Sequence, residues 1–515
     1  MTNILYYKKI IVPLIIFLGA ITSFSLPPYN FTLINFITFP IFFLIIVIHK
    51  DSSKKFLFLI GWLFGFGYFI SNLYWISYSL THDEIFKFLI PFSIMFIPLF
   101  LAIFYGLSVL VLSFFNFGRN FQSILIFSLI FSIMEFLRGH VLSGFPWNLI
   151  VYSLSDKINH LQVLSLTGTY SLNLLCITIF FIPCLIFYKK KIIHKVFILL
   201  TLLVLIFANN FFGSYRINNL EKIPQKYSEM KIKIVSPRIE INRFFNNSST
   251  EHTINEIITL TNSDENKPSI YIFPEGIFPD TNLDDLITFK KIIKNNFGKK
   301  DVLIIGLNTN NQISSQNKIY NSLVVVDNEL NILHVYNKNK LVPFGEFLPF
   351  ENFFRNFGLK KVSFGYESFS RGEKREPIYF DNLKIKFLPT ICYEMIYSGK
   401  IKGNNKDLDF FINISEDGWF GNSIGIHQHF VHSIFRSIEE GTSIMRSANN
   451  GISAFISPFG KIIKQIKSTK KGVIEIKSYY SNVETIFSRE GNKIFFYFLL
   501  IYISLIFLIK TRKKK

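Results

Sequence analysis

The strongest constraint on the fold of this chain is a series of long apolar runs separated by short polar breaks. Each run is about as long as a helix must be to cross a bilayer core, roughly 20 residues. Charged residues make up only 17% of the 515 residues, against roughly 25% in a soluble domain. The sequence therefore predicts a multi-span α-helical membrane domain with about eight transmembrane helices. They cover residues 10–26, 31–48, 56–74, 88–116, 121–138, 166–188, 193–213 and 493–509.

Composition divides the chain into three parts. Residues 1–213 contain the first seven apolar runs and form the predicted membrane domain. In residues 214–490, charged and polar residues alternate with short apolar runs, which is typical of a domain in water. Residues 491–515 contain the last apolar run and a basic tail. We therefore expect a soluble domain between the seventh and the eighth membrane helix.

Basic residues cluster at every second break between the apolar runs. Cytoplasmic loops of membrane proteins carry an excess of lysine and arginine. The loops on the opposite side contain only Lys87 and Lys157. Both termini are therefore expected in the cytoplasm, and residues 214–490 on the exported side. The clusters are Lys8 and Lys9; Lys50, Lys54 and Lys55; Arg119; Lys189, Lys190, Lys191 and Lys195; and Lys510 with Arg512, Lys513, Lys514 and Lys515.

The net charge of +20 does not indicate a nucleic-acid partner. Most of the excess lies outside residues 214–490, where it reports membrane topology. A protein that binds nucleic acid would carry a basic face on its soluble domain, and residues 214–490 show no such stripe.

The three cysteines divide between the two predicted domains. Cys176 and Cys184 lie in the sixth apolar run, where small apolar side chains serve packing. Cys392 is the only cysteine in residues 214–490, so that domain cannot form an internal disulfide. A lone thiol in an oxidising compartment suggests a nucleophile.

The exported domain alternates strand-like and helical stretches, which predicts a layered α/β fold. Helices are expected at residues 250–261, 283–296 and 426–439. Strands are expected at residues 231–236, 269–273, 301–308, 320–327, 332–337, 383–392, 408–414, 452–457 and 461–466.

Three reactive side chains lie at the ends of predicted strands. Glu275 follows the apolar run 269–274, Lys338 follows residues 332–337, and Cys392 ends the run that begins at Leu383. If these strand ends meet at one edge, they bring together a nucleophile, a general base and a cation.

The segments around these three residues resemble the Glu-Lys-Cys triad of the nitrilase (carbon–nitrogen hydrolase) superfamily, whose fold is an αββα sandwich. Within it, nearly the whole chain is similar to the apolipoprotein N-acyltransferase family. The similarity in the exported part rests on the segments 273–275, 336–347, 391–394, 417–421, 428–429 and 446–451. In the membrane part it rests on residues 24–30, 73–75, 135–139 and 144–147. The chain departs from the family pattern at Ser171, Glu416, Ile426 and Thr442.

The resemblance implies an N-acyltransferase of the bacterial inner membrane with a ping-pong mechanism. Cys392 would be the nucleophile, Glu275 the general base and Lys338 the residue that stabilises the oxyanion. A membrane phospholipid would donate an acyl chain to Cys392 as a thioester. The acceptor would be the α-amine of the N-terminal diacylglyceryl-cysteine of an apolipoprotein.

The resemblance also implies supporting residues and no cofactor. Glu346, Tyr393 and Glu394 are expected beside the triad. Substrate contacts are expected at Trp147, Trp419 and Phe420. No metal is expected, because the spacing of His427, His429 and His432 suits one helix turn better than a closed metal site.

Two other functions are compatible with part of the pattern. A membrane-tethered amidase for a small soluble amide would need only one anchor, so eight apolar runs argue against it. A transporter with an exported binding domain would carry ionisable residues in mid-membrane. The apolar runs contain few beyond Glu135 and Arg138, which lie at the end of one run.

Overall fold

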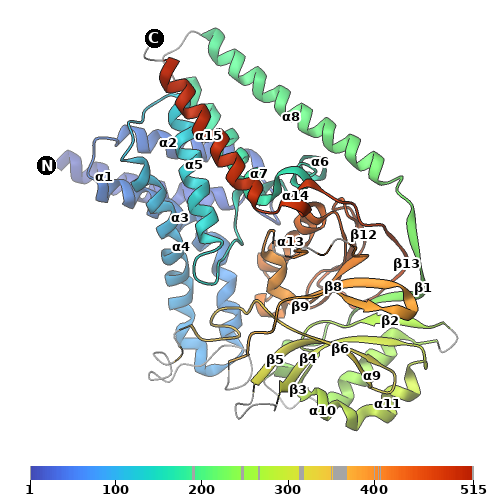
Figure 1. The fold of residues 1–515 in the computed structure, drawn as a ribbon. Helices are drawn as coiled ribbons and strands as arrows, with labels where there is room; N and C mark the ends of the chain where they lie inside the picture. The colour runs from blue at the N-terminus through green and yellow to red at the C-terminus, as the bar shows by residue number, and fades with distance from the viewer. Residues whose placement is uncertain are drawn as a thin grey trace. The chain divides into compact units, whose positions relative to one another are not determined.

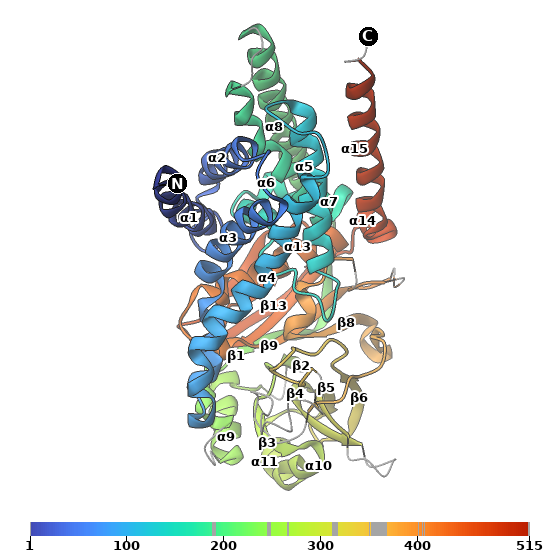
Figure 2. The same cartoon turned by 90° about the vertical axis from the view of Figure 1, so that its left-hand side faces the viewer.

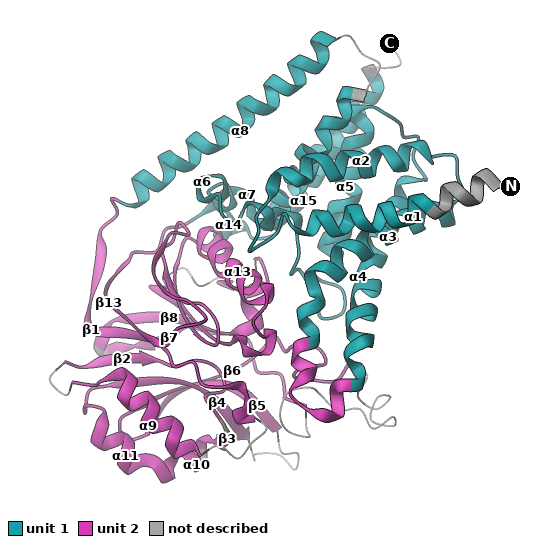
Figure 3. Cartoon of the chain, turned by 180° about the vertical axis from the view of Figure 1, so that it is seen from behind, with its two compact units in different colours: residues 1–77, 88–221, 485–515 teal, residues 78–87, 222–484 magenta. Residues whose placement is uncertain are grey.

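The structure is a computed structural model and divides into two compact units (Figure 3). We call residues 1–77, 88–221 and 485–515 the helical unit, and residues 78–87 and 222–484 the sandwich unit. The structure describes residues 2–187, 192–244, 249–264, 267–311, 318–349, 351, 368–399, 401–403, 405 and 407–512.

The helical unit consists of apolar helices (Figure 1). Among the described residues, six stretches are long and apolar enough to cross a membrane, and two further apolar helices, Ile10–Ser23 and Thr32–Ile48, are shorter. The expectation of a multi-span helical domain is confirmed, while the number of eight crossings stays a prediction. The helices are α1 (Thr2–Ser23), α2 (Asn35–Ile48), α3 (Lys54–Leu73), α4 (Ile90–Leu112), α5 (Phe121–Arg138), α6 (Ile158–Leu161), α7 (Leu164–Phe181), α8 (Ile192–Leu220), α14 (Ile486–Glu490) and α15 (Lys493–Arg512).

Small residues and aromatic rings pack the helices of this unit. A Cβ on Gly61 of α3 would lie 2.4 Å from the carbonyl oxygen of Tyr105 on α4, so the two backbones approach closely. The rings of Phe42 and Phe64 stack with centroids 4.0 Å apart. Helix packing in a membrane depends on such van der Waals contact, because lipid tails are as apolar as the side chains.

The sandwich unit contains two β-sheets (Figure 2). The first has the strand order β13-β1-β2-β4-β5-β6, with β3 also paired to β4, and the second has the order β12-β11-β10-β9-β8-β7. The first sheet consists of β1 (Gln225–Ser236), β2 (Ser269–Ile272), β3 (Phe278–Asn282), β4 (Val302–Asn311), β5 (Lys318–Asp327), β6 (Ile332–Asn337) and β13 (Gly472–Tyr480). The second consists of β7 (Ile378–Phe380), β8 (Ile385–Ile391), β9 (Phe410–Glu416), β10 (Ser443–Asn449), β11 (Ser453–Ile456) and β12 (Ile462–Ile466).

Helices cover the outer faces of both sheets, which gives the expected αββα layering (Figure 1). Helices α9 (Thr250–Thr261), α10 (Leu283–Leu286) and α11 (Lys290–Asn296) lie on the first sheet, where Ile254 and Ile293 join its apolar core. Helix α13 (Ile424–Glu440) packs on the second sheet. The sheets contact each other directly, because Ser447 of β10 donates a 2.7 Å hydrogen bond to the carbonyl of Val235 in β1.

Strand direction determines where the reactive side chains gather. β1, β2 and β4 run parallel, and β6 points the same way because it is antiparallel to β5, itself antiparallel to β4. In the second sheet β8, β9 and β10 are parallel. Within each sheet, the carboxyl ends of these strands therefore lie along one edge.

Several elements differ from the sequence-based expectation. Strands β3, β7, β10 and β13 were not expected, and the helix expected at 283–296 is interrupted. β10 has four polar residues among its seven, Ser443, Arg446, Ser447 and Asn449, without the alternation that marks a strand, yet all seven are buried. The early helix stop follows a capping box at Asn282 that starts α10, which lasts only to Leu286.

Candidate active site

Glu275 lies in a turn that continues from β2 and packs against β4. The backbone N–H of Phe273 donates to Ile304 O at 2.8 Å, and that of Ile277 donates to Gly306 O at 3.0 Å. A Cβ on Gly306 would lie 2.5 Å from the Cα of Glu275. Glycine at this position therefore lets the turn lie close to the strand and holds the Glu275 side chain at the sheet edge.

Lys338 follows β6 directly and forms two buried ion pairs. Its Nζ donates to Oε1 of Glu275 at 3.0 Å and to Oε1 of Glu346 at 2.8 Å. Asn321 of β5 donates to the same two oxygens at 2.7 and 2.8 Å. Burial alone would lower the pKa of Lys338, but the two carboxylates outweigh it and hold that pKa well above its usual value. Lys338 is therefore a permanently charged ammonium with a fixed position.

Cys392 begins the 3₁₀ segment Cys392–Ile396, immediately after β8. Its φ is +47°, a left-handed conformation that costs a residue with a side chain roughly 1–3 kcal/mol. The thiol is buried, and burial together with the charge of Glu275 raises its pKa well above the usual value, while Lys338 lowers it. The thiol is therefore protonated at rest and needs a base, and Glu275 and Lys338 are its electrostatic neighbours.

Glu394 connects the turn after Cys392 with the loop after Lys338. Its Oε2 accepts from Ile391 N at 2.9 Å, and its Oε1 accepts from Asn339 N at 3.0 Å and from Lys340 N at 3.1 Å. Burial would raise the pKa of Glu394, but its ion pair with Arg375, 3.0 Å long, is among the contacts that lower it. The ionised Glu394 side chain thus links the segment that carries Cys392 to the segment that carries Lys338.

Two adjacent residues at the end of β9 extend the site. The backbone N–H of Glu416 donates to Oε2 of Glu275 at 2.9 Å. Oδ1 of Asp417 lies 2.9 Å from Nδ1 of His429, and Nε2 of His429 lies 3.3 Å from the carbonyl oxygen of Cys392. The end of β9 therefore contacts both reactive segments. The backbone of Glu416 binds the carboxylate of Glu275, and Asp417 contacts His429, which lies next to the carbonyl of Cys392.

Arg446 of β10 neutralises Asp417. Its Nη2 lies 2.8 Å from Oδ2 of Asp417, and both side chains are fully buried. Burial would raise the pKa of Asp417, yet Arg446 and His429 lower it far below the usual range. Burial lowers the pKa of His429, and Asp417 only partly offsets this.

The aromatic residues expected to bind substrate fall into both units. In the sandwich unit, the Trp419 ring lies 5.2 Å from that of Phe244, and the Phe420 ring lies 5.4 Å from that of His429. Tyr393 is buried with its ring 5.5 Å from that of Tyr397. Trp147 belongs to the helical unit and is buried there.

The position of Trp147 is set by neighbouring rings and by an ion pair. Its ring lies 5.1 Å from that of Trp75. Glu135 and Arg138 form a buried 2.6 Å ion pair at the end of α5, and Arg138 also donates to the carbonyl of Phe145. The ion pair therefore holds the loop that carries Trp147.

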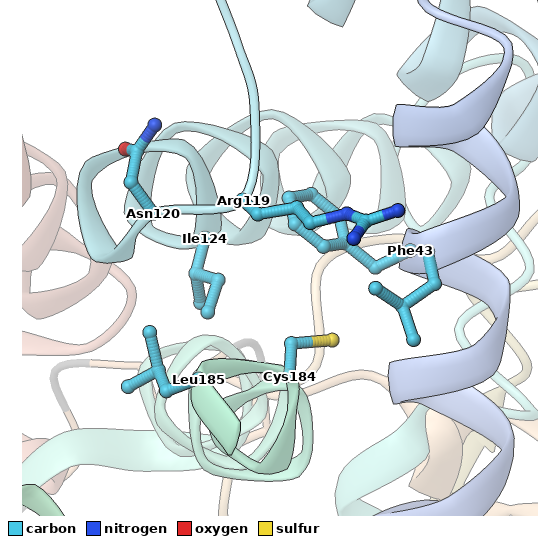
Figure 4. Close-up of a pocket in the computed structure, with 7 residues that line it drawn as sticks. Phe43, Arg119, Asn120, Ile124, Cys184 and Leu185 are labelled. Carbon is cyan, nitrogen blue, oxygen red and sulfur yellow. The ribbon is translucent and has the colours of Figure 1, made fainter. Parts of the chain in front are cut away.

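A small hollow in the helical unit is not a second reactive site. Figure 4 shows Cys184, which belongs to the 3₁₀ segment Ile182–Phe187, at a hollow that Phe43 of α2 and Ile124 of α5 also line. The space is too small for a water molecule, and Cys184 donates a 3.3 Å hydrogen bond to Pro40 O. This agrees with a packing role for the cysteine.

Sequence reasoning missed Asn321 and the hydrogen bond from Glu416, and it gave His429 no contact with the nucleophile. Asn321 lies in a strand of mostly apolar residues, and a polar residue in such a strand could have indicated a functional contact. His427, His429 and His432 all lie on α13. Among the described residues, no group of three His, Cys, Asp or Glu side chains is placed to hold a metal ion.

Two family models match separate segments of the chain, and known proteins match most of its length. The family model described as apolipoprotein N-acyltransferase N-terminal domain matches residues 18–182. The model described as carbon-nitrogen hydrolase matches residues 280–480. Among solved structures, Nit3 of Saccharomyces cerevisiae, from the nitrilase superfamily, is 16% identical, with a TM-score of 0.35 over 52% of this chain and 94% of that chain.

Curated relatives extend over almost the whole sequence. The apolipoprotein N-acyltransferase of Rickettsia prowazekii is 31% identical over 87% of this chain and 89% of its own length. That of Rhodopseudomonas palustris is 30% identical over 94% of this chain and 92% of its own length. The chain therefore belongs to the apolipoprotein N-acyltransferase family.

Proposed function

We propose that this protein transfers an acyl chain from a membrane phospholipid to the N-terminal α-amine of diacylglyceryl-cysteine in apolipoproteins, through a thioester on Cys392. The observation that carries the proposal is that three strand ends from the two sheets, and not from one sheet edge, bring Glu275, Lys338 and Cys392 together. Glu275 and Lys338 follow β2 and β6 of the first sheet and lie 3.0 Å apart. Cys392 follows β8 of the second sheet, and the charges of both residues act on its thiol. Family membership supports the same reaction class.

In the first half-reaction, Glu275 accepts the thiol proton of Cys392 and the thiolate attacks an ester carbonyl of the phospholipid. The carbonyl oxygen becomes an oxyanion in a tetrahedral intermediate. When the intermediate collapses, the carbon–oxygen bond to glycerol breaks and the leaving oxygen takes the proton back from Glu275. The products are a lysophospholipid and an acyl thioester.

Lys338 is suited to stabilise that oxyanion. An ammonium group has three N–H donors, and two of them point to Glu275 and Glu346. The third remains for the developing negative charge, at a position that the two carboxylates fix in advance. Removing one such preorganised donor typically costs 10²–10³ in rate.

In the second half-reaction, the α-amine of the acceptor attacks the thioester. Glu275, again ionised, removes a proton from the amine as the carbon–nitrogen bond forms. The carbon–sulfur bond then breaks, and the sulfur of Cys392 leaves as thiolate and regains a proton from Glu275. The enzyme returns to its starting state, as a ping-pong mechanism requires.

Supporting and membrane roles complete the proposal. Glu346 and Glu394 fix Lys338 and the loop after it, and Tyr393, the residue after the nucleophile, is buried with its ring against that of Tyr397. Trp147, Trp419 and Phe420 contact lipid substrates. The chain resides in the bacterial inner membrane with both termini in the cytoplasm and residues 214–490 exported, and residues 1–213 and 491–515 contain its membrane helices.

The test is mass spectrometry of the purified full-length protein after incubation with phospholipid that carries an isotope-labelled acyl chain. We expect one labelled acyl group on Cys392, sensitive to hydroxylamine, and none on Cys176 or Cys184. Adding a diacylated cysteine peptide should discharge the label to the peptide amine. Transfer to the peptide without acyl-Cys392 at any time would refute the thioester route.

A further inference from the structure

We propose that the buried ion pair between Arg243 and Glu416 is a positioning device for the general base, holding Glu275 from two sides. The inference rests on the proposed role of Glu275 as base. It concerns two residues outside the Glu-Lys-Cys set, and it gives a purpose to Glu416, where the chain departs from the family pattern.

Both carboxylate oxygens of Glu416 accept hydrogen bonds. The residue is 1% exposed, and its oxygens accept from Gly418 N at 2.8 Å and from Asn449 Nδ2 at 2.8 Å, besides the ion pair with Arg243. These contacts make Glu416 the N-cap of the short 3₁₀ segment Asp417–Phe420. They fix the peptide group of Glu416, whose N–H is the donor to Glu275 Oε2.

Arg243 holds the other side of the base. The residue is 3% exposed, and its guanidinium donates to the carbonyl oxygen of Gly276 from Nη2 at 3.0 Å and from Nε at 3.3 Å. Gly276 is the residue that follows Glu275 and has a φ of +56°, a conformation that favours glycine. Further bonds to Ile239 O and Glu240 O fix the arginine itself.

The two halves of the pair therefore act on one carboxylate. Arg243 fixes the backbone next to Glu275, and Glu416 presents the N–H that orients Oε2. Because Oε1 of Glu275 already accepts from Lys338 and Asn321, Oε2 is the oxygen with room for the proton of the thiol. A shift of the ion pair moves that oxygen, and a misplacement of about 1 Å can cost on the order of 10² in rate.

A purely structural ion pair makes a different prediction. Removing one partner of a buried pair leaves an unpaired charge and destabilises strongly, whereas replacing both partners with neutral side chains is often tolerated. If the pair only stabilised the fold, activity would follow stability and return in the double variant. A positioning pair leaves activity low even where stability returns.

The experiment compares R243M/E416Q with R243M, R243K and the wild type, all as full-length protein. Glutamine at 416 can still cap Gly418, and methionine cannot donate to Gly276. We expect R243M to lose thermal stability and R243M/E416Q to regain most of it. The double variant should keep its KM for phospholipid, while kcat for acyl-enzyme formation falls about 100-fold. R243K keeps the charge but lacks the planar guanidinium, so its kcat should lie between those of the wild type and the double variant.

A control uses an ion pair at the other end of the same strand, in which the lysine is half exposed. Asp409 precedes β9 and pairs with Lys226 at 2.6 Å, so K226M/D409N should keep its kcat. A folded R243M/E416Q, or an R243K variant, with wild-type kcat would overturn the proposal. Should the double variant fail to fold, R243K alone decides.

A second readout separates this inference from the proposed acyl transfer. The rate at which iodoacetamide alkylates Cys392 depends on removal of the thiol proton and needs no lipid. Slower alkylation in R243M/E416Q and R243K supports the positioning role even if the wild type forms no acyl thioester. Unchanged alkylation in folded variants, with acyl transfer intact in the wild type, refutes the positioning role alone.

Discussion

Nε2 of His429 lies 3.3 Å from the carbonyl oxygen of Cys392. The histidine thus contacts the backbone of a residue that is held at a φ of +47°. Nη2 of Arg446 donates to Nδ1 at 3.1 Å, which leaves the proton of the neutral ring on Nε2, facing that carbonyl. His429 is therefore placed to support the strained turn that presents the nucleophile.

Replacing His429 should slow acylation without abolishing it. In His429→Phe the carbonyl of Cys392 loses its donor, and we expect kcat to fall about tenfold, the effect of one hydrogen bond of about 1.4 kcal/mol. His429→Gln can still donate from its amide and should recover part of the loss. Steady-state kinetics on the two variants, with melting temperatures as a control for folding, would check this. Equal kcat for both variants would contradict the role of a donor.

Lys338→Arg tests the oxyanion contact. Arginine keeps the charge but replaces a compact ammonium with a planar fork, which does not fit between Glu275 and Glu346 in the same way. We expect the rate of acyl-enzyme formation to fall 10²–10³-fold. Single-turnover measurement with labelled phospholipid would show it. An arginine variant at near wild-type rate would mean that the oxyanion is stabilised by another group.

Cys392→Ser should fold and insert normally and form no acyl-enzyme, because a serine hydroxyl is far less acidic than a thiol. Glu275→Gln should also block acylation, since an amide holds the geometry but accepts no proton. The two variants differ toward a thiol alkylator: serine removes the target, and glutamine leaves a cysteine that reacts slowly. Substantial N-acylation of a diacylated peptide by Cys392→Ser would require abandoning the covalent route.

Stability should depend on pH through Glu440 at the end of α13. Burial, followed by the charge of Glu439, raises the pKa of Glu440 to about 8, although Lys402 and Arg436 lower it. A carboxyl with a raised pKa binds its proton more tightly in the folded state, so the free energy of unfolding falls as pH rises from about 4.3 toward that value. We expect the melting temperature to decrease between pH 5 and pH 8.

Glu440→Gln should flatten that dependence and melt above the wild type at pH 8. The exposed Glu376 provides the control, because Glu376→Gln should leave the curve unchanged. Parallel curves for the wild type and Glu440→Gln would show that another group carries the pH dependence.

Reporter fusions test the membrane topology. Basic clusters fall at every second break between the apolar runs, all on one side of the membrane, so fusions after Lys190 and Lys515 should report cytoplasm and one at Asn310 the exported side. Paired enzymatic reporters, one active only in the cytoplasm and one only outside it, give a signal in either case. A cytoplasmic Asn310 would reverse the orientation.

The positions of Glu275, Lys338 and Cys392 could be predicted because each follows a recognisable apolar strand. The layered fold followed from the same alternation of strands and helices. β6 and α9 have the bounds that the sequence indicates, Ile332–Asn337 and Thr250–Thr261. Such local patterns carry their own signal, because side-chain periodicity reflects burial.

Contacts that depend on strand register could not be predicted. Asn321 reaches Glu275 and Glu346 only because β5 pairs with β6 so that Ser322 faces Asn337. β10 was missed because its polar residues, Arg446 among them, are buried by partners distant in sequence. Tertiary contacts decide such cases, and no local pattern encodes them.

The hydrogen bond from Glu416 to Glu275 comes from a main-chain N–H, and this affects which residues evolution can place at position 416. Every amino acid except proline supplies that N–H, so the contact leaves no signature at position 416 when sequences are aligned. In a library with all amino acids at position 416, the activity of most variants should vary gradually with how well the side chain fixes the peptide group. Proline should stand apart as the one residue that deletes the donor itself.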